Sequence, residues 1–399
     1  MMAWMIWIIA SIFYAYQYVL RVMPNIMLND IMQQFHIDAA TFGQFAGIYY
    51  LGYSLMHLPI GILLDRHGPK NIMSLCILLT VIGLTPLIFS EDPLFLILGR
   101  GLIGIGSSAA ILGIFKIIRM TFSETKFPRM LSLSVTIGLI GAIYGGGPVN
   151  YLRDTFGYET VIYSFALAGV VLALATYAFI PETKTPSQTT IRGDIAEVFK
   201  NRKVLWTCLS AGLMIGPLEG FADVWGSSFL HDVYGLAGTS AASLPSMIFI
   251  GMCFGSPLLN WVAEKSKNYL LTIIGSGMVM MAGFLALLTY KLPVGVLTVS
   301  FILIGICSAY QILAIYKAST YARAQVAGLT TAAANMIIMT FGYAFHTAMG
   351  TVINAMGGPT SSKALFYGVA IIPACLFLGV IGFAMLVFQE KKGRSSYFG

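Results

Sequence analysis

The sequence predicts an all-α membrane protein with twelve transmembrane helices, arranged as two pseudosymmetric six-helix bundles. Uncharged segments such as 72–89, 161–180 and 270–289 come close to the roughly 20 residues that an α-helix needs to cross a hydrocarbon core of about 30 Å. Hydrophobic residues make up 57% of the chain and charged residues only 10%, whereas a soluble domain has about half and a quarter. The segments lack the apolar–polar alternation of barrel strands, so we expect them to span as helices.

Each apolar stretch between two polar gaps predicts one helix. The first six are expected at 4–27, 41–64, 70–90, 94–117, 130–152 and 159–180, and the last six at 204–229, 241–263, 270–290, 294–316, 326–350 and 365–388. The N-terminus has neither the basic region nor the cleavage site of a secretory signal, so we expect the first stretch to be a retained span.

The polar stretch at 181–203 divides the helices into two sets of six. It is the longest hydrophilic segment of the chain, and we interpret it as a linker rather than a domain. The expected organisation is a six-helix bundle at 1–180, a cytoplasmic linker at 181–203, and a second six-helix bundle with a short cytoplasmic tail at 204–399.

The positive charges predict the orientation. Of the 23 lysines and arginines, Arg21 and Arg100 lie inside spans, and of the others only Arg153, Lys291 and Lys363 fall on the side opposite the termini. Because Lys and Arg are enriched in cytoplasmic loops, both termini are expected in the cytoplasm. We expect a multi-pass protein of a bacterial inner membrane.

Several functional classes have no support in the sequence. The net charge of +7 is segregated by loop, so it does not indicate nucleic-acid binding. The five cysteines all fall in predicted spans without a CxxC pair, and we interpret them as apolar fillers rather than as a metal or disulfide framework. No Walker A sequence occurs. We therefore expect no metal, no cofactor and no enzymatic activity.

The loop after the second predicted span carries the most specific motif. It runs from Gly61 through Asp65 and Arg66 to Gly68, Pro69 and Lys70. This pattern resembles the signature loop of the major facilitator superfamily, from which only Pro69 departs. A weaker copy in the second half has Gly251, Asn260, Glu264 and Lys265. The resemblance implies two related six-helix halves and a secondary transporter that works by alternating access.

The same loop has a physical interpretation. Glycines at positions 52 and 61 would allow close helix approach, and Gly68 with Pro69 would form a tight turn. Asp65 would hold a helix N-terminus or a neighbouring arginine, for which Arg119 is the candidate. The resemblance implies a gating role for Asp65 and Arg66, and we expect Gly61, Gly68 and Arg119 to belong to the same gate. An ordinary loop that obeys the positive-inside rule is the alternative.

Two glycine-rich spans are less specific. The stretch from Arg100 to Ala110 contains Gly-x-Gly-x-x-Ala, but it lies in the middle of a span, so helix packing is the better interpretation than nucleotide binding. It is also similar to a second motif of the superfamily. The glycines at 138, 141 and 145–147, followed by Pro148, partly resemble the antiporter motif of drug–proton exchangers, and similar runs also serve packing alone.

Four charges inside spans give the sharpest functional prediction. Arg21, Arg100, Glu219 and Asp223 are expected near a common depth. The two acids are four residues apart and share a helix face, and Gly216 with Pro217 predicts a break just before them. Two carboxylates in a low dielectric cannot both ionise cheaply, so one of them should bind a proton more readily than an ordinary carboxylate does. A proton-coupling site requires such a group. Glu219, which we expect to lie deeper than Asp223, is the first candidate for the proton carrier.

Polar and aromatic residues predict a solute pocket around these charges. The expected substrate-binding residues are Arg21, Arg100, Tyr14, Gln17, Tyr18, Asn25, Tyr310, Gln311 and Asn335. Further candidates are Tyr50, Tyr53, His57, Ser308 and His346. The alternatives are that the tyrosines mark the membrane interface and that the histidine is only packing.

The arginines allow two interpretations. Arg21 either grips a solute carboxylate or latches the outer gate by pairing with Glu219 or Asp223, and a transporter can use both in turn. Arginines facing acids suit a zwitterion, whose carboxylate would go to the arginines and whose amine would go to the acids. The strings 16–25 and 216–225 are similar to a branch of the superfamily in intracellular bacteria, the phagosomal transporter group, some of whose members resemble amino-acid importers and others siderophore transporters.

We therefore expect proton-coupled import of a small zwitterionic nutrient, such as an amino acid or short peptide. A proton-driven exporter of a polycarboxylate siderophore or a drug is the first alternative. A non-transporting receptor is the second, and the lack of a soluble domain argues against it. The expected partners are the solute, protons and the lipid bilayer, with no nucleic acid, and the protein is expected to be a monomer.

Overall fold

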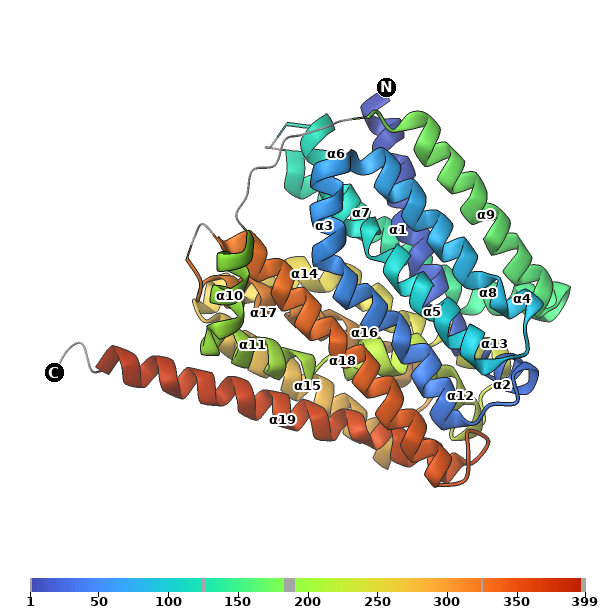
Figure 1. The fold of residues 1–399 in the computed structure, drawn as a ribbon. Coiled ribbons are helices and arrows are strands. Elements are labelled where there is room, and N and C mark those ends of the chain that lie inside the picture. The colour runs from blue at the N-terminus through green and yellow to red at the C-terminus, as the bar shows by residue number, and fades with distance from the viewer. Residues whose placement is uncertain (1, 124–125, 183–190, 324–325, 396–399) are drawn as a thin grey trace.

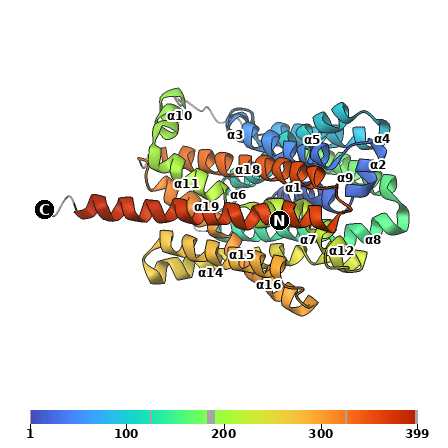
Figure 2. The ribbon, with the colours of Figure 1, turned by 90° about the horizontal axis from the view of Figure 1, so that it is seen from below.

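The computed structural model describes residues 2–123, 126–182, 191–323 and 326–395. Within these ranges the chain forms helices and no strand. Figure 1 shows the blue and green helices of the first half at the upper right and the yellow to red helices of the second half at the lower left, and Figure 2 shows the same molecule from below. The predicted all-α class is confirmed.

The helical elements described in the first half follow one another along the chain. They are α1 (Met2–Val22), the 3₁₀ turn η1 (Met23–Asn25), α2 (Leu28–Gln34), α3 (Ala39–Leu84), α4 (Pro86–Phe89), α5 (Pro93–Ser107), α6 (Ala109–Thr121), α7 (Phe127–Gly145), α8 (Gly147–Phe156) and α9 (Tyr158–Phe179).

The second half follows the helix α10 (Ile191–Lys200). Its elements are α11 (Arg202–Gly212), the π-helix η3 (Gly216–Trp225), α12 (Gly226–Asp232), α13 (Gly238–Ser243), α14 (Ser246–Ser266), α15 (Tyr269–Thr289), α16 (Val294–Ser308), α17 (Tyr310–Ser319), α18 (Ala327–Ala355) and α19 (Ser362–Ser395).

These elements account for the twelve predicted spans. In the described part of the chain, ten helical stretches are long and apolar enough to cross a membrane. One of them, Ala39–Phe89, has 51 residues and is interrupted at Gly68, whose φ of 76° is accessible to glycine, so it holds two spans. One more comes from α7 and α8, which meet at an angle of 41°. The tight turn predicted at Gly68 and Pro69 is confirmed.

The expected linker contains a helix, α10, whose apolar residues Ile191, Ile195, Val198 and Phe199 recur at helical spacing. Residues 183–190 of the expected linker lie outside the described residues, but α10 follows them. Glu197 of α10 pairs with Arg323, and the Asn201 side chain donates to the Tyr321 carbonyl over 2.8 Å. The arginine lowers the pKa of the Glu197 carboxyl by hydrogen bonding to it. These contacts tie α10 to the segment after α17.

Glycines set the close packing within each half. A Cβ at Gly52 would lie 2.6 Å from the Gly101 carbonyl oxygen, so α3 and α5 touch there as the sequence predicts. The corresponding position in the second half is Gly251, where a Cβ would collide with the Ile302 carbonyl. Gly61 differs from the prediction, since the nearest atom to a Cβ there would be 3.9 Å away and no close approach requires glycine.

The two halves also share a sequence repeat. Residues 102–105 and 303–306 both read Leu-Ile-Gly-Ile, and 111–116 (Ile-Leu-Gly-Ile-Phe-Lys) matches 312–317 (Ile-Leu-Ala-Ile-Tyr-Lys). The helix break between α5 and α6 at Ser108 corresponds to the break between α16 and α17 at Ala309. This repeat accords with two related halves.

The two halves meet closely along α3 and α18. We call this contact the seam. A Cβ at Gly43 would lie 3.1 Å from Gly350 Cα, one at Gly47 would lie 3.1 Å from Tyr343, and Gly342 packs on the ring of Tyr50. The seam lies toward the end of the molecule that carries α2, α8, α12 and α13, away from both termini (Figure 1). The charge bias predicts that this end is external.

Candidate functional site

A buried ion-pair cluster joins the two halves. The Arg21 Nε donates to Asp223 Oδ2 over 2.6 Å, and an Arg21 terminal nitrogen pairs with Glu219 Oε2. Only 7% of Arg21, 1% of Glu219 and none of Asp223 is exposed. Three of the four charges predicted to share a depth therefore contact one another directly.

The local backbone places these side chains. Arg21 sits in the last turn of α1, just before η1 begins at Met23, with Pro24 inside it. The break predicted before Glu219 is confirmed: α11 ends at Gly212 and the π-helix starts at Gly216. The wider turn of a π-helix is common at functional sites, and here it turns Glu219 and Asp223 toward the same guanidinium.

Tyr50 of α3 bridges the two acids. Its hydroxyl lies 2.5 Å from Glu219 Oε2 and also contacts Asp223 Oδ2. The Arg21 guanidinium carbon lies 5.1 Å from the ring centroids of both Tyr18 and Tyr50, a cation–π geometry. A phenol has one proton to donate, so Tyr50 can satisfy one carboxylate at a time. A protonated carboxyl can in turn donate to the Tyr50 oxygen.

The charge balance of this cluster favours proton binding. Two carboxylates contact the guanidinium of Arg21, whereas the guanidinium of Arg100 nearby binds the carbonyls of Leu20 and Arg21 rather than either acid. A proton on either acid leaves one ion pair with Arg21, and the cost of burying the second carboxylate in its ionised form, several kcal/mol, is removed. Asp223 Oδ1 has no hydrogen-bond partner among the described residues, which leaves an oxygen able to accept that proton.

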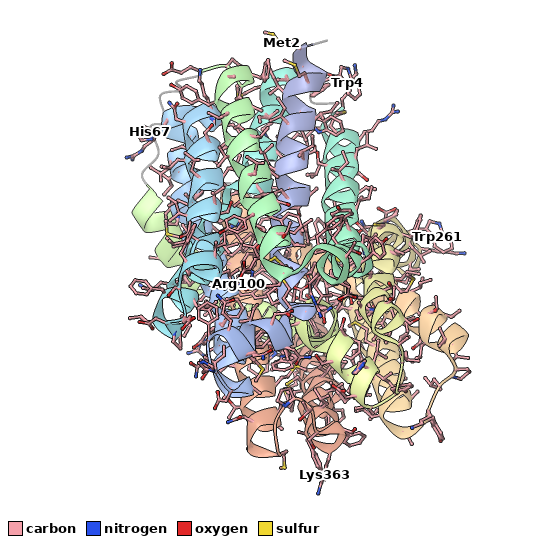
Figure 3. The ribbon with its side chains drawn as sticks, turned by 90° about the vertical axis from the view of Figure 1, so that its right-hand side faces the viewer. Met2, Trp4, His67, Arg100, Trp261 and Lys363 are labelled. Carbon is pink, nitrogen blue, oxygen red and sulfur yellow. The ribbon has the colours of Figure 1, made fainter. Side chains whose placement is uncertain are left out.

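Arg100, labelled in Figure 3, binds the backbone of α1. It donates to the carbonyls of Leu20 over 2.6 Å and of Arg21 over 2.8 Å, and its guanidinium lies 4.8 Å from the ring centroid of Tyr49. A cation that caps the last carbonyls of a helix stabilises the helix end. In this conformation Arg100 therefore holds the turn that presents Arg21, and its terminal nitrogens are engaged.

The remaining predicted residues of α1 and η1 lie around the cluster. Asn25 donates to the Ala222 carbonyl over 3.2 Å and accepts from the Ser227 amide over 3.1 Å, so it holds η3. Gln17 accepts from the Tyr49 hydroxyl over 2.6 Å. Tyr14 and Tyr18 stack edge to face with centroids 5.1 Å apart, and both are buried between helices rather than exposed at a membrane interface.

The predicted binding residues of the second half make no hydrogen bond or ion pair with the ion-pair cluster in the described part of the chain. Tyr310 donates to the Ala211 carbonyl over 2.7 Å near the end of α11. Gln311 is buried, and its Nε2 has no hydrogen-bond partner in the described ranges. Asn335 is half-buried on α18. In the sequence repeat, Tyr310 and Gln311 of the second half correspond to Ala109 and Ala110 of the first. A comparison of the two halves would therefore have singled out these two polar residues.

The expected partner of Asp65 differs from the prediction. Asp65 Oδ1 pairs with Lys116 Nζ at 2.9 Å, whereas the Arg119 guanidinium lies over the Phe127 ring at 5.4 Å. Lys116 is one turn before Arg119 on α6 and is the closer cation. Arg66 is exposed. Asp65 and Lys116 both belong to the first half, so this pair fixes α3 against α6 and does not join the two halves.

The Asp65–Lys116 pair gives a testable prediction. Asp65 is 59% exposed at its side chain, so Asp65→Asn and Lys116→Gln should each change the free energy of unfolding by less than about 1 kcal/mol. If this pair gates the transport cycle, both variants and the double variant should lose the same fraction of the transport rate. Uptake by the four proteins forms a double-mutant cycle, and additive losses would contradict a shared role.

Comparisons with known proteins settle the family. The family model of the Major Facilitator Superfamily matches residues 6–347. This chain belongs to the major facilitator superfamily. It is a multi-pass membrane transporter of the secondary class, and its relatives and fold neighbours are transporters rather than enzymes.

Individual members of the superfamily are distant from this chain. The YybO transporter of Bacillus subtilis is 25% identical over 72% of both chains, and the nitrite extrusion protein of the same organism is 19% identical over 80% of this chain and 79% of its own. Among solved structures, the nucleoside transporter NupG matches with a TM-score of 0.75 over 96% of this chain and 99% of its own, at 16% identity. An inward-facing, occupied bacterial homologue of Spinster matches with a TM-score of 0.74 over 96% of each chain, at 16% identity. These structures support the twelve-helix, two-bundle fold.

Proposed function

We propose that this superfamily member is a proton-coupled transporter that imports a small zwitterionic nutrient, such as an amino acid or short peptide. The observation that carries the proposal is the position of Arg21, which belongs to one half and pairs with two acids of the other. The side chains that pair across the two halves are therefore the ones that we propose to bind the solute and the proton.

The cluster links protonation to the contact between the halves. A proton on Glu219 or Asp223 removes one of the two carboxylates that hold Arg21, which weakens the attraction across the interface. The released guanidinium can then take a solute carboxylate in bidentate fashion. The remaining ionised acid can pair with the solute amine. A zwitterion therefore replaces both partners of the ion pair, which an anion or a cation alone cannot do.

The substrate class can be tested by ligand-dependent stability. The purified protein would be heated with about 10 mM of single amino acids, dipeptides, citrate or a lipophilic cation. A ligand at ten times its dissociation constant stabilises the folded state by about 1.4 kcal/mol, which shifts the unfolding temperature measurably. Stabilisation by one zwitterion class supports the proposal, and stabilisation by citrate or the cation alone would contradict it.

The proton role predicts a split between two assays. Glu219→Gln should abolish accumulation driven by a pH gradient in proteoliposomes, because the position can no longer gain and lose a proton. Exchange of labelled for unlabelled solute at equal pH should persist, because it needs no net proton movement. Accumulation that survives in this variant would exclude Glu219 as the proton carrier.

Export is the second candidate, and one relative favours it. One of the two Bacillus subtilis relatives, which matches 80% of this chain, is named for nitrite extrusion. Proton-driven loading of a polycarboxylate or drug into inside-out vesicles, without uptake of zwitterions by right-side-out vesicles, would replace the import proposal with this one.

A further inference from the structure

His346 is a buried titratable residue that the proposed cycle does not yet use. It lies on α18 in the seam, where a Cβ at Gly43 of α3 would collide with its carbonyl oxygen. The side chain is completely buried. Neither Nδ1 nor Nε2 has a hydrogen-bond partner among the residues that the structure describes.

The imidazole lies next to the ion-pair cluster. Its ring is 5.4 Å from the ring of Tyr50, tilted by 33°, and the Tyr50 hydroxyl contacts Glu219 and Asp223. The charged groups that face it from other helices are therefore the two acids of η3, reached through Tyr50, together with Arg21 of α1 and Arg100 of α5. One aromatic ring separates His346 from the proposed proton site.

The closed seam is an unfavourable place for this side chain. Each buried polar atom without a partner costs about 1–3 kcal/mol, and a charged imidazole would add a third cation near two arginines. If α3 and α18 separate, water can reach both ring nitrogens. A hydrated imidazole takes up a proton at about pH 6.5. Opening the seam therefore removes the cost and allows the histidine to become charged.

We propose that His346 is a second proton acceptor of the transport cycle, which is protonated while the seam is open and must lose its proton before the seam closes. The inference rests on the proposed proton coupling. Before closure, the proton leaves the imidazole nitrogen for a water molecule of the open seam. The imidazole becomes neutral and the water becomes a hydronium ion that returns to the solution, so charge is conserved and the closed state holds one proton fewer than the open state.

The proposal predicts how the seam responds to pH. If only the open state binds a proton at His346, the ratio of open to closed molecules should rise about tenfold between pH 7.5 and pH 5.5. The distance between spin labels at Gln33→Cys and Ala355→Cys, two exposed positions on opposite halves, would measure this ratio in reconstituted protein whose five native cysteines are replaced. No solute is needed.

Two variants and one control make the test specific. His346→Phe removes the two unpartnered nitrogens, and His346→Gln keeps hydrogen-bonding capacity but does not titrate. Both should lose the tenfold change near pH 6.5. His57→Phe is the matched control, because His57 is also buried, has an Nδ1 without a hydrogen-bond partner among the described residues, and has its ring 5.2 Å from that of Tyr53, tilted by 43°.

The outcomes separate this inference from the proposed function. A pH response that persists in both His346 variants, or that disappears equally in His57→Phe, would overturn the role of His346. Accumulation in Glu219→Gln would instead contradict the proposed function, whatever the histidine variants do. Loss of the response in both His346 variants alone, together with loss of accumulation in Glu219→Gln, would support both.

Discussion

Replacement of Arg21 by methionine is expected to destabilise the protein by about 3–5 kcal/mol, because it leaves two buried carboxylates without their cation. Transport should be lost as well, since the same guanidinium is the proposed solute ligand. Chemical unfolding of the detergent-solubilised protein measures the first effect, and uptake by proteoliposomes measures the second.

The triple variant Arg21→Met, Glu219→Gln, Asp223→Asn separates the two effects. It removes all three formal charges, so most of the lost stability should return, whereas transport should stay absent. A single Arg21→Met variant that unfolds like the wild-type protein would show that the ion pairs do not hold the halves in solution. Recovery of transport in the triple variant would exclude this cluster as the coupling site.

A bulky side chain in the seam is expected to prevent the two halves from closing. In Gly43→Leu, the new Cβ would lie 3.1 Å from Gly350 Cα and against the His346 carbonyl. Backbone atoms cannot move aside as a flexible side chain can, so α3 and α18 must separate. We expect a shift of the population toward the open seam by tenfold or more, equivalent to at least about 1.4 kcal/mol, together with loss of transport.

The matched control is Gly275→Leu on α15, where no atom lies within 4 Å of the added Cβ. It should leave the seam distance and the transport rate near their wild-type values. The spin-label distance across the seam measures both variants. If Gly43→Leu keeps the wild-type distance and rate, the close packing of α3 on α18 is not required for the cycle.

The fold was predictable because it depends on patterns within single helices. The length of each apolar stretch determines a span, Gly68 permits the turn between two spans, and Gly216 with Pro217 interrupts a helix. A helix break and a shared depth also bring Arg21, Glu219 and Asp223 within reach of one another. These properties depend on local chemistry and on the thickness of a bilayer.

The partners of each side chain were harder to predict, because they depend on how helices far apart in sequence pack. Arg100 binds carbonyls of α1 rather than standing free for a solute, and Asp65 pairs with Lys116 rather than with Arg119. Two carbonyls one residue apart accept from Arg100, and two cations one turn apart could pair with Asp65. The packing of the helices determines which partner each side chain meets. The bridge made by Tyr50 likewise arises only when α3 meets η3 and α18, and so does the burial of His346 without a hydrogen-bond partner among the described residues.

The central claim is that solute movement carries protons through the cluster of Arg21, Glu219 and Asp223. Proteoliposomes that contain a pH-sensitive dye would receive, without an imposed pH gradient, the zwitterion that stabilises the protein most. The account predicts that the interior acidifies as the solute enters through the wild-type protein and that it does not acidify with Glu219→Gln. Solute entry through the wild-type protein with no change in internal pH would contradict the account.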